Sequence, residues 1–275
     1  MLDCADKTLD LSRPQVMGVL NVTPDSFSDG GRYVILDAAM TQAREMVEAG
    51  AVVIDVGGES TRPGAAPVSE QEELDRVIPV IEAIKAELSV VVSIDTRKSS
   101  VMHAAVSAGA GLINDVCALR EEGALEAAAQ LQVPVCLMHM QGEQRSMQAA
   151  PHYDDVVREV KDFLSRRVVD CEAAGIPRER LLMDPGFGFG KALDHNLSLF
   201  KHLDAFAELG LPLVVGVSRK SLIGAVLDVP PAQRLYGSIA LAALAVWQGA
   251  VLIRAHDVAA TVQAIKMVEA VRSAS

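Results

Sequence analysis

The stretch LPLVVGVSR, residues 211–219, shows the pattern on which the fold prediction depends. It is a continuous apolar run without strict alternation, and it ends at polar and charged residues. A parallel strand that is covered on both faces has this pattern, because neither of its faces meets water. The sequence therefore predicts a buried strand that stops at two hydroxyls and two cations, Ser218, Arg219, Lys220 and Ser221.

Seven further runs of this kind occur along the chain. Between the runs lie segments with helical patterns, such as residues 69–88, where Ser69 and Glu72 have the spacing of a capping box. Strands that alternate with helices, without a linker or low-complexity tract, predict an α/β (β/α)8 TIM barrel, a single domain over residues 1–275. An open doubly wound sheet is the alternative. The seven runs are QVMGVLN (15–21), AVVIDVGG (51–58), VVVSIDT (90–96), GLINDV (111–116), VPVCLMHM (133–140), LLMDPGF (181–187) and VLIRAHD (251–257).

Composition and charge exclude several classes of protein. Half of the 275 residues are apolar, and the net charge of -11 works against broad attraction to nucleic acid or to an anionic membrane. The most apolar long segment, residues 238–253, is too short to span a bilayer, and residues 1–11 lack the pattern of a secretory signal. The four cysteines show no metal-ligand spacing and are expected to be reduced packing residues. We expect a cytoplasmic protein with no nucleic-acid or membrane partner.

The predicted helix over residues 234–248 lacks the polar face that an outer barrel helix needs. Its sequence, RLYGSIALAALAVWQ, is polar only at Arg234, Ser238 and Gln248, apart from the hydroxyl of Tyr236. A second subunit is the simplest cover, so we predict a homodimer with this helix in or beside the interface. The alternative is that a neighbouring helix or the N-terminal segment covers it.

Polar residues that close the runs should meet, because the carboxyl ends of all barrel strands point to one rim, where chemistry is done. Asp95, Asn114 and Asp184 are rich in hydrogen-bond acceptors. Buried carboxylates are costly unless they are bonded to donors, so these residues predict a ligand with several N–H groups, such as an amino-pyrimidinone ring. The other acceptors and ring nitrogens at strand ends are Asn21, Asp55, Asp115 and His139.

The cations form a second set at the ends of the last two strands. Arg219 and Lys220 follow one run, and Arg254 and His256 follow the next. This position is the common phosphate site of the barrel architecture, so an anionic ligand group is predicted there, across the barrel mouth from the ring. Two long loops, residues 21–33 and 57–70, combine Gly, Pro, Ser and Asp and are expected to act as lids.

These motifs together resemble those of the dihydropteroate synthases, the folate-pathway enzymes that sulfonamides target. The resemblance runs in order from about residue 15 to 270 and implies a homodimeric α/β barrel. Such an enzyme joins 4-aminobenzoate to (7,8-dihydropterin-6-yl)methyl diphosphate and releases 7,8-dihydropteroate and diphosphate. The motifs are GVLNVTPDSFSDGG (18–31), DVGGESTRPGA (55–65), SIDT (93–96), INDV (113–116), LMHMQG (137–142), DPGFGFGK (184–191), SRKSLIG (218–224) and IRAHDV (253–258).

The resemblance also implies a role for individual residues. The pterin ring would be held by Asp95, Asn114, Asp184 and Lys220, with Met138 lining its pocket. The diphosphate would be held by Arg254, His256, Asn21, Thr61 and Arg62, with Asn21 also a ligand of Mg²⁺. The aminobenzoate site would be formed by Thr61, Arg62, Pro63, Phe189, Lys220 and Ser221. The residues expected to act in catalysis are Asp95, Asp184, Lys220 and Arg254. The two lines of reasoning differ for Lys220. Its position at a strand end puts it with the anion-binding cations, whereas the resemblance puts it beside the pterin and the aminobenzoate.

Two other functions remain open at this point. A pterin-binding methyltransferase shares the barrel and the Asp, Asn, Asp set but moves a methyl group to a corrinoid, and it needs no diphosphate site. A catalytically silent folate-binding protein would keep the pocket alone. The cation cluster and the two long loops favour the synthase over both.

Overall fold

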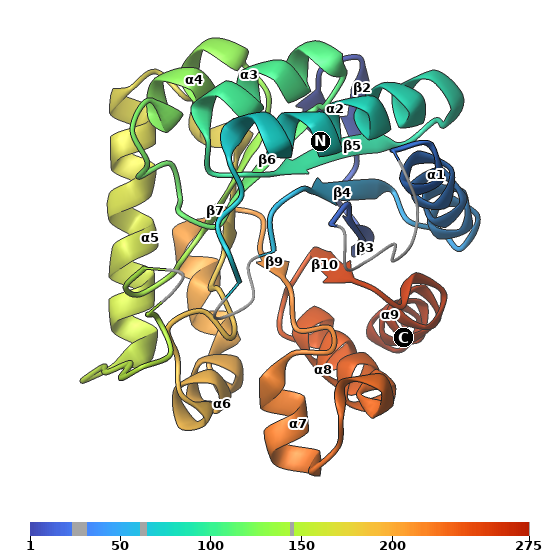
Figure 1. The fold of residues 1–275 in the computed structure, drawn as a ribbon. Coiled ribbons are helices and arrows are strands. Elements are labelled where there is room, and N and C mark those ends of the chain that lie inside the picture. The colour runs from blue at the N-terminus through green and yellow to red at the C-terminus, as the bar shows by residue number, and fades with distance from the viewer. Residues whose placement is uncertain (24–31, 61–64, 144–145, 275) are drawn as a thin grey trace.

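The computed structural model describes residues 1–23, 32–60, 65–143 and 146–274, with no side-chain description for residues 32–34. Within these residues, a parallel sheet of eight strands lies inside a ring of helices (Figure 1). Each of the eight predicted runs contains one strand of this sheet. The strands are β3 (Gln15–Asn21), β4 (Val53–Gly57), β5 (Val91–Asp95), β6 (Leu112–Asp115), β7 (Val135–Met138), β8 (Leu181–Asp184), β9 (Val214–Val215) and β10 (Leu252–Ala255).

The sheet closes on itself. Its hydrogen-bonded order is β8-β7-β6-β5-β4-β3-β10-β9, and an isolated parallel bridge joins Met183 to Leu213 between the first and last strands. The amide of Met183 donates to the carbonyl of Pro212 at 3.0 Å at the same seam. The (β/α)8 barrel is therefore confirmed, and the open doubly wound sheet is wrong.

Helices follow the strands and cover the outside of the barrel (Figure 1). The predicted capping box is present: Glu72 N donates to Ser69 Oγ at 3.3 Å, and Ser69 N donates to Glu72 Oε2 at 3.0 Å. The α-helices are α1 (Arg32–Glu48), α2 (Glu70–Glu87), α3 (Ser99–Ala108), α4 (Ala124–Leu131), α5 (Val156–Ala173), α6 (Leu193–Lys201), α7 (Ser221–Leu227), α8 (Leu235–Trp247) and α9 (Val258–Arg272), and short 3₁₀ turns lie at η2 (Arg178–Arg180), η3 (Leu203–Leu209) and η4 (Pro231–Gln233).

An N-terminal hairpin, which the sequence analysis missed, seals the barrel end where the strands begin. It pairs β1 (Leu2–Cys4) with β2 (Lys7–Leu9), and its apolar side chains pack in one cluster with the first inward layer of the barrel, including Met17 and Val91. The approach is close, since a Cβ on Gly111 would lie 2.4 Å from the carbonyl oxygen of Cys4. The polar rim residues lie at the opposite end of the barrel, where the strands stop.

The cysteines agree with the sequence analysis. Cys4, Cys117, Cys136 and Cys171 are all buried free thiols, as predicted. Among the described residues, no helix combines the length and the apolar character needed to cross a membrane.

The outer side of α8 is exposed in the single chain. Tyr236 is 81% exposed and Trp247 is 57% exposed, and Leu244 between them is also exposed. Met267 and Val271 extend this apolar surface onto α9, which packs beside α8. The alternative that another described part of the chain covers this side is therefore wrong.

Candidate active site

The carboxyl ends of the strands bring the predicted acceptors together. The register pairs Asp95 of β5 with Asn114 of β6 on one side and with Gly57 of β4 on the other, and Gly57 pairs in turn with Asn21 of β3. The side chains of Asp95, Asn114 and Asp184 are all buried. All strands of a parallel barrel run in the same direction, so their carboxyl ends meet at one rim, which is why these distant residues converge.

Arg254 of β10 lies among the carboxylates. Its Nε donates to Asp55 Oδ2 at 2.6 Å, and its Nη2 donates to Asp95 Oδ2 at 2.7 Å. Burial acts to lower the pKa of Arg254, but Asp55 and Asp95 outweigh it and raise that pKa. Burial also raises the pKa of Asp95 to about 7, with Arg254 acting in the opposite direction. The expected separation of acceptors on one flank and cations on the other is therefore wrong for Arg254, because a buried carboxylate needs a cation next to it.

Asp184 faces the same space as Arg254. One of its oxygens, Oδ1, accepts a hydrogen bond from Gly186 N at 2.7 Å. A methyl group built on Gly216 would lie 3.6 Å from Arg254 Cβ and 3.9 Å from Asp184 Oδ2. Burial raises the pKa of Asp184, and Lys220 is the main opposing influence. The small residue at position 216 keeps the space between the cation and this carboxylate open.

Asn21 reaches the site from the neighbouring side. A methyl group built on Gly57 would lie 3.6 Å from Asn21 Oδ1 and 3.7 Å from Asp95 Oδ2. The two oxygens therefore share the space above Gly57.

Lys220 lies beside an aromatic side chain and a carboxylate. Its Nζ donates to the carbonyl oxygen of Phe187 at 2.5 Å and stands 4.6 Å from the centre of the Phe189 ring. Burial lowers the pKa of Lys220 to about 8, and Asp184 acts to raise it. This location agrees with the place that the family resemblance implies, between the acceptor set and Phe189.

An apolar wall adjoins these polar groups. Met138, at the end of β7, and Phe189 are buried in one apolar cluster with Val116, Cys117 and Met140. Apolar and aromatic walls with a few placed polar groups are typical of sites for small heterocyclic molecules.

The other residues expected after the last two strands differ in what they contact. His256 bonds to Ser218, whose Oγ lies 3.2 Å from the His256 amide nitrogen and 3.1 Å from Nδ1. Ser221 is exposed at the first position of α7. Arg219, by contrast, donates to both oxygens of Asp257, at 2.9 and 2.5 Å. Its expected place in the anion-binding set is therefore not supported.

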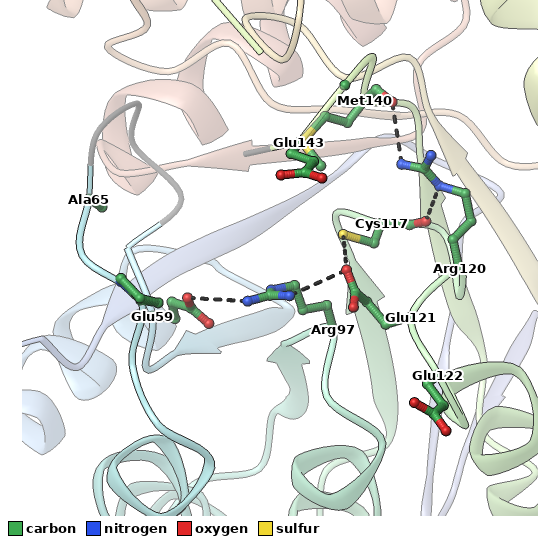
Figure 2. A pocket seen from close by; sticks show the side chains of 11 residues that line it. Glu59, Ala65, Arg97, Cys117, Arg120, Glu121, Glu122, Met140 and Glu143 are labelled. Atoms are coloured by element: carbon green, nitrogen blue, oxygen red, sulfur yellow. Dashed lines mark hydrogen bonds and ion pairs between the residues drawn. The ribbon is translucent and has the colours of Figure 1, made fainter. Parts of the chain in front are cut away.

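A polar pocket of about 390 Å³ lies beside the apolar wall, and Figure 2 shows its lining. Arg97 joins two strand-end loops there, with Nη2 3.6 Å from Glu59 and Nη1 3.3 Å from Glu121. Lys98 also donates to Glu59, at 2.9 Å, and to the carbonyl oxygen of Val68 at 2.8 Å. These contacts anchor both ends of the segment that holds Thr61, Arg62 and Pro63, which themselves lie outside the described residues, as do residues 24–31 of the other expected lid.

Two polar residues expected at the rim do not face the site. Asp115 instead accepts the amides of Cys117 and Leu119, each at 2.7 Å, and so shapes the turn after β6. His139 is buried against Lys191, whose Nζ lies 2.9 Å from its Nδ1. The sequence analysis missed Lys191, whose only signal was a cation at the end of a glycine-rich run.

Comparison with known proteins places this geometry in a family. The family model described as pterin binding enzyme matches residues 17–256. The dihydropteroate synthase of Escherichia coli K12 is 57% identical over 267 residues, which cover 97% of this chain and 95% of that protein.

Two solved structures of Xanthomonas albilineans dihydropteroate synthase are also similar. One, with 4-aminobenzoic acid, has a TM-score of 0.95 and 53% identity, and covers 100% of this chain and 98% of the other. The second, in complex with 7,8-dihydropteroate, has a TM-score of 0.92 and 51% identity over 100% and 99% of the two chains. Such identity over the full length exceeds what a shared fold alone requires. The chain belongs to the dihydropteroate synthases, within the pterin-binding enzymes.

Proposed function

We infer that the chain carries out the dihydropteroate synthase reaction of folate biosynthesis. In this transfer, the pterin-methyl group of (7,8-dihydropterin-6-yl)methyl diphosphate passes to the amine of 4-aminobenzoate, and diphosphate is released. The observation that carries the inference is the convergence of Asp95, Asn114 and Asp184 with Arg254 at one end of the barrel. Acceptors and a cation in one buried site match a donor-rich ring with an anionic tail.

We propose that the pterin ring binds to Asp95, Asn114 and Asp184, with Lys220 and Met138 beside it. Asn114 Nδ2 donates to Asp55 Oδ2 at 3.0 Å, which leaves the amide oxygen as an acceptor. Asp184 uses Oδ1 for Gly186 and keeps Oδ2 beside the open space above Gly216. Each of the three side chains can thus offer an oxygen to the N–H groups of an amino-pyrimidinone ring.

We propose that the diphosphate binds to Arg254 and His256, together with Asn21, Thr61 and Arg62. Mg²⁺ commonly keeps several waters and takes one or two protein oxygens plus phosphate oxygens, so a single amide oxygen of Asn21 fits it. The described residues hold no cluster of three or more His, Cys, Asp or Glu ligands, which suits a metal that arrives with its substrate. Bound there, Mg²⁺ would neutralise charge on the diphosphate.

We propose that 4-aminobenzoate binds against Phe189, with its carboxylate near Ser221 and Lys220, and with Thr61, Arg62 and Pro63 completing the site. The Phe189 ring gives an aromatic ligand a stacking face, and Lys220 Nζ lies 4.6 Å from that ring. The carboxylate would also approach the amide end of α7, which begins at Ser221.

An arylamine is a weak nucleophile, so the mechanism we propose relies on the leaving group. The bond between the methylene carbon and the diphosphate oxygen breaks first, and Arg254 and His256 stabilise the departing charge. Positive charge then spreads from the methylene carbon over the pterin ring, where Asp95 and Asp184 favour it. The arylamine nitrogen bonds to this carbon and loses one proton.

Diphosphate release, measured with and without 4-aminobenzoate, tests this function. A synthase releases diphosphate that depends on 4-aminobenzoate and forms 7,8-dihydropteroate in equal amount. A pterin-binding methyltransferase would release no diphosphate under either condition. A silent binding protein would bind the pterin substrate in calorimetry and leave it intact.

We also propose that the chain is a homodimer in the cytoplasm. The exposed apolar surface of α8 and α9, with Tyr236, Leu244, Trp247, Met267 and Val271, supports a second copy as its cover. Isologous contact of one patch with itself is the commonest way in which such surfaces are buried. Four free buried thiols are compatible with a reducing compartment.

A further inference from the structure

A buried lysine that the proposed mechanism does not use lies behind the glycine-rich loop that follows β8. Lys191 is only 3% exposed. Its Nζ donates to Gly186 O at 2.8 Å and to Phe189 O at 3.1 Å, and lies 2.9 Å from His139 Nδ1. Burial lowers the pKa of Lys191 well below its usual value, and Asp184 acts in the opposite direction. Three acceptors surround Nζ, as many as an ammonium group has N–H donors. A polar group buried this deeply is costly, so its complete set of partners calls for a physical reason.

The loop between Asp184 and Lys191 contacts the active site on one side and Lys191 on the other. On the site side, Gly186 N donates to Asp184 Oδ1 at 2.7 Å, and Phe187 O accepts from Lys220 Nζ at 2.5 Å. The Phe189 ring lies under the same Lys220 ammonium. On the other side, Lys191 holds the carbonyls of Gly186 and Phe189. The loop groups that face the site are Gly186 N, Phe187 O and the Phe189 ring. Both carbonyls that Lys191 binds are therefore within three residues of each of these groups.

The backbone of this loop does not hold its shape by local preference. Gly186, Gly188 and Gly190 all have positive φ, at 72°, 80° and 60°. Glycine populates these angles readily but also many others, so a loop with three such residues needs external contacts to select one conformation. Gly186 cannot be replaced, since a Cβ there would lie 1.9 Å from His139 O. Tyr153 Oη also donates to Gly190 O at 2.8 Å.

His139 fixes the third hydrogen bond of Lys191. The ring is buried and packs edge-on against Phe163, with centroids 4.8 Å apart. Burial, and the nearby charge of Lys191, lower the pKa of His139 to about 2, so the imidazole is neutral at physiological pH. One hydrogen bond therefore joins Nδ1 of this neutral ring to Lys191 Nζ, over 2.9 Å.

We propose that Lys191, oriented by His139, is a positioning residue that sets Phe189 and Lys220 in place for the arylamine. The inference rests on the proposed function, because it assigns Phe189 to the aminobenzoate site. Lys191 touches neither substrate in this scheme and acts through the loop backbone. If Lys191 served only to stabilise the fold, its substitution would lower stability but would not change the Michaelis constant of one substrate selectively.

The first test is Lys191→Met, which removes the three donors and keeps a similar shape. We expect KM for 4-aminobenzoate to rise at least about tenfold, because a shift of about 1 Å in a positioned group can cost up to ~100-fold. KM for the pterin diphosphate should rise less, since Asp95, Asn114 and Asp184 lie on strands, and only Lys220 and the Gly186 bond to Asp184 depend on the loop. Lys201→Met, an exposed lysine on α6, is the matched control and should leave both constants unchanged.

The second test separates an effect through Phe189 from a general one. In a Phe189→Ala background, Lys191→Met should raise KM for 4-aminobenzoate by less than about threefold, because the ring that it positions is gone. Equal increases in the two backgrounds would overturn the proposal.

The third test uses His139 and does not require the lysine to be changed. His139→Asn keeps an acceptor oxygen close to the place of Nδ1 and should retain a nearly normal KM for 4-aminobenzoate. His139→Leu removes the acceptor and should reproduce the Lys191→Met increase. If Lys191→Met fails to fold, this pair of variants decides the matter. Failure of both Lys191→Met and His139→Leu to fold would overturn the proposal, because the pair would then serve the fold and not the site.

Wild-type activity in the same assays keeps the two inferences apart. If the wild-type protein releases diphosphate in the presence of 4-aminobenzoate and both variants retain its KM, the positioning role is wrong while the function stands. If the wild-type protein releases none, the proposed function itself fails.

Discussion

Arg254 and Asp95 meet across the interior of the barrel, with Nη2 of the arginine 2.7 Å from Oδ2 of the aspartate, although the two residues are 159 positions apart in the chain. Their strands, β10 and β5, are not neighbours, because β3 and β4 lie between them in the sheet. The same guanidinium donates to Asp55 at 2.6 Å. One cation thus neutralises two buried carboxylates and also stands where the diphosphate is proposed to bind.

Arg254→Ala should lower affinity for the pterin diphosphate far more than for the bare pterin, because the diphosphate loses a direct contact, whereas Asp95, Asn114 and Asp184 remain as acceptors for the ring. The variant should also lose about 3–5 kcal/mol of unfolding free energy, since two buried carboxylates are left without a partner. Calorimetry with both ligands and urea unfolding at neutral pH measure the two effects. An equal loss of affinity for both ligands would contradict the assignment of Arg254 to the diphosphate.

Asp95 should make pterin binding depend on pH. Burial raises its pKa from 3.8 to about 7, so the free protein takes up a proton here as the pH falls from 8 to 6. If the ionised carboxylate accepts the ring N–H groups, affinity for the bare pterin should fall below pH 7, by up to about tenfold for each pH unit. Calorimetry between about pH 5.5 and pH 8.5, roughly 1.5 pH units on each side of the midpoint, measures this.

The stability contribution of Asp95 has the opposite sign. Its folded-state pKa is above the value of 3.8 expected when unfolded, so the folded state binds the proton more tightly. The stability that this gives is fully present below pH 3.8 and is lost as the pH rises through about 7. In Asp95→Asn, both this trend and the pH dependence of pterin affinity should be reduced. A binding curve that keeps its shape in the variant would show that another group titrates.

Asp184→Asn should weaken pterin binding by roughly 10- to 100-fold, the range expected when a hydrogen bond to a charged group is lost. The amide can keep the bond from Gly186 N, which is 2.7 Å from Oδ1, but it presents a donor where a carboxylate accepts. Fluorescence titration with the bare pterin measures the change. A variant with wild-type affinity would remove Asp184 from the pterin site.

Phe189→Ala should raise KM for 4-aminobenzoate by about tenfold or more, as expected when about 1.5–3 kcal/mol of apolar contact is removed. The pterin constant should move less, since the acceptor residues are intact. Phe189→Leu restores apolar volume without an aromatic face and should recover part of the loss. Steady-state kinetics with each substrate varied in turn measure both constants. A rise confined to the pterin constant would be inconsistent with the proposed place of the ring.

Trp247→Glu on α8 should dissociate the proposed dimer, because a carboxylate would be buried in an apolar interface. Val169→Glu is the control, since Val169 is similarly exposed, at 61% against 57%, but lies on α5. Sedimentation velocity at micromolar concentration distinguishes the species. A wild-type protein that sediments only as a monomer would end the dimer proposal.

The sequence alone determined the elements whose signals are local. Continuous apolar runs located all eight barrel strands, and the spacing of Ser69 and Glu72 located the start of α2, because burial on both faces and helix capping each act over a few residues. The same runs showed which polar residues reach the catalytic rim. The N-terminal hairpin was missed because two strands of three residues each carry too little pattern to be recognised.

The tertiary structure decided which of the rim residues face a common space. Asn114 and Asp115 are adjacent, yet one bonds to Asp55 inside the barrel and the other shapes a turn, because side chains alternate along a strand. Arg219 and Arg254 end neighbouring strands, yet one pairs with Asp257 at the surface and the other with two buried carboxylates. Closure of the sheet selects such partners from distant parts of the chain, and no local spacing encodes them.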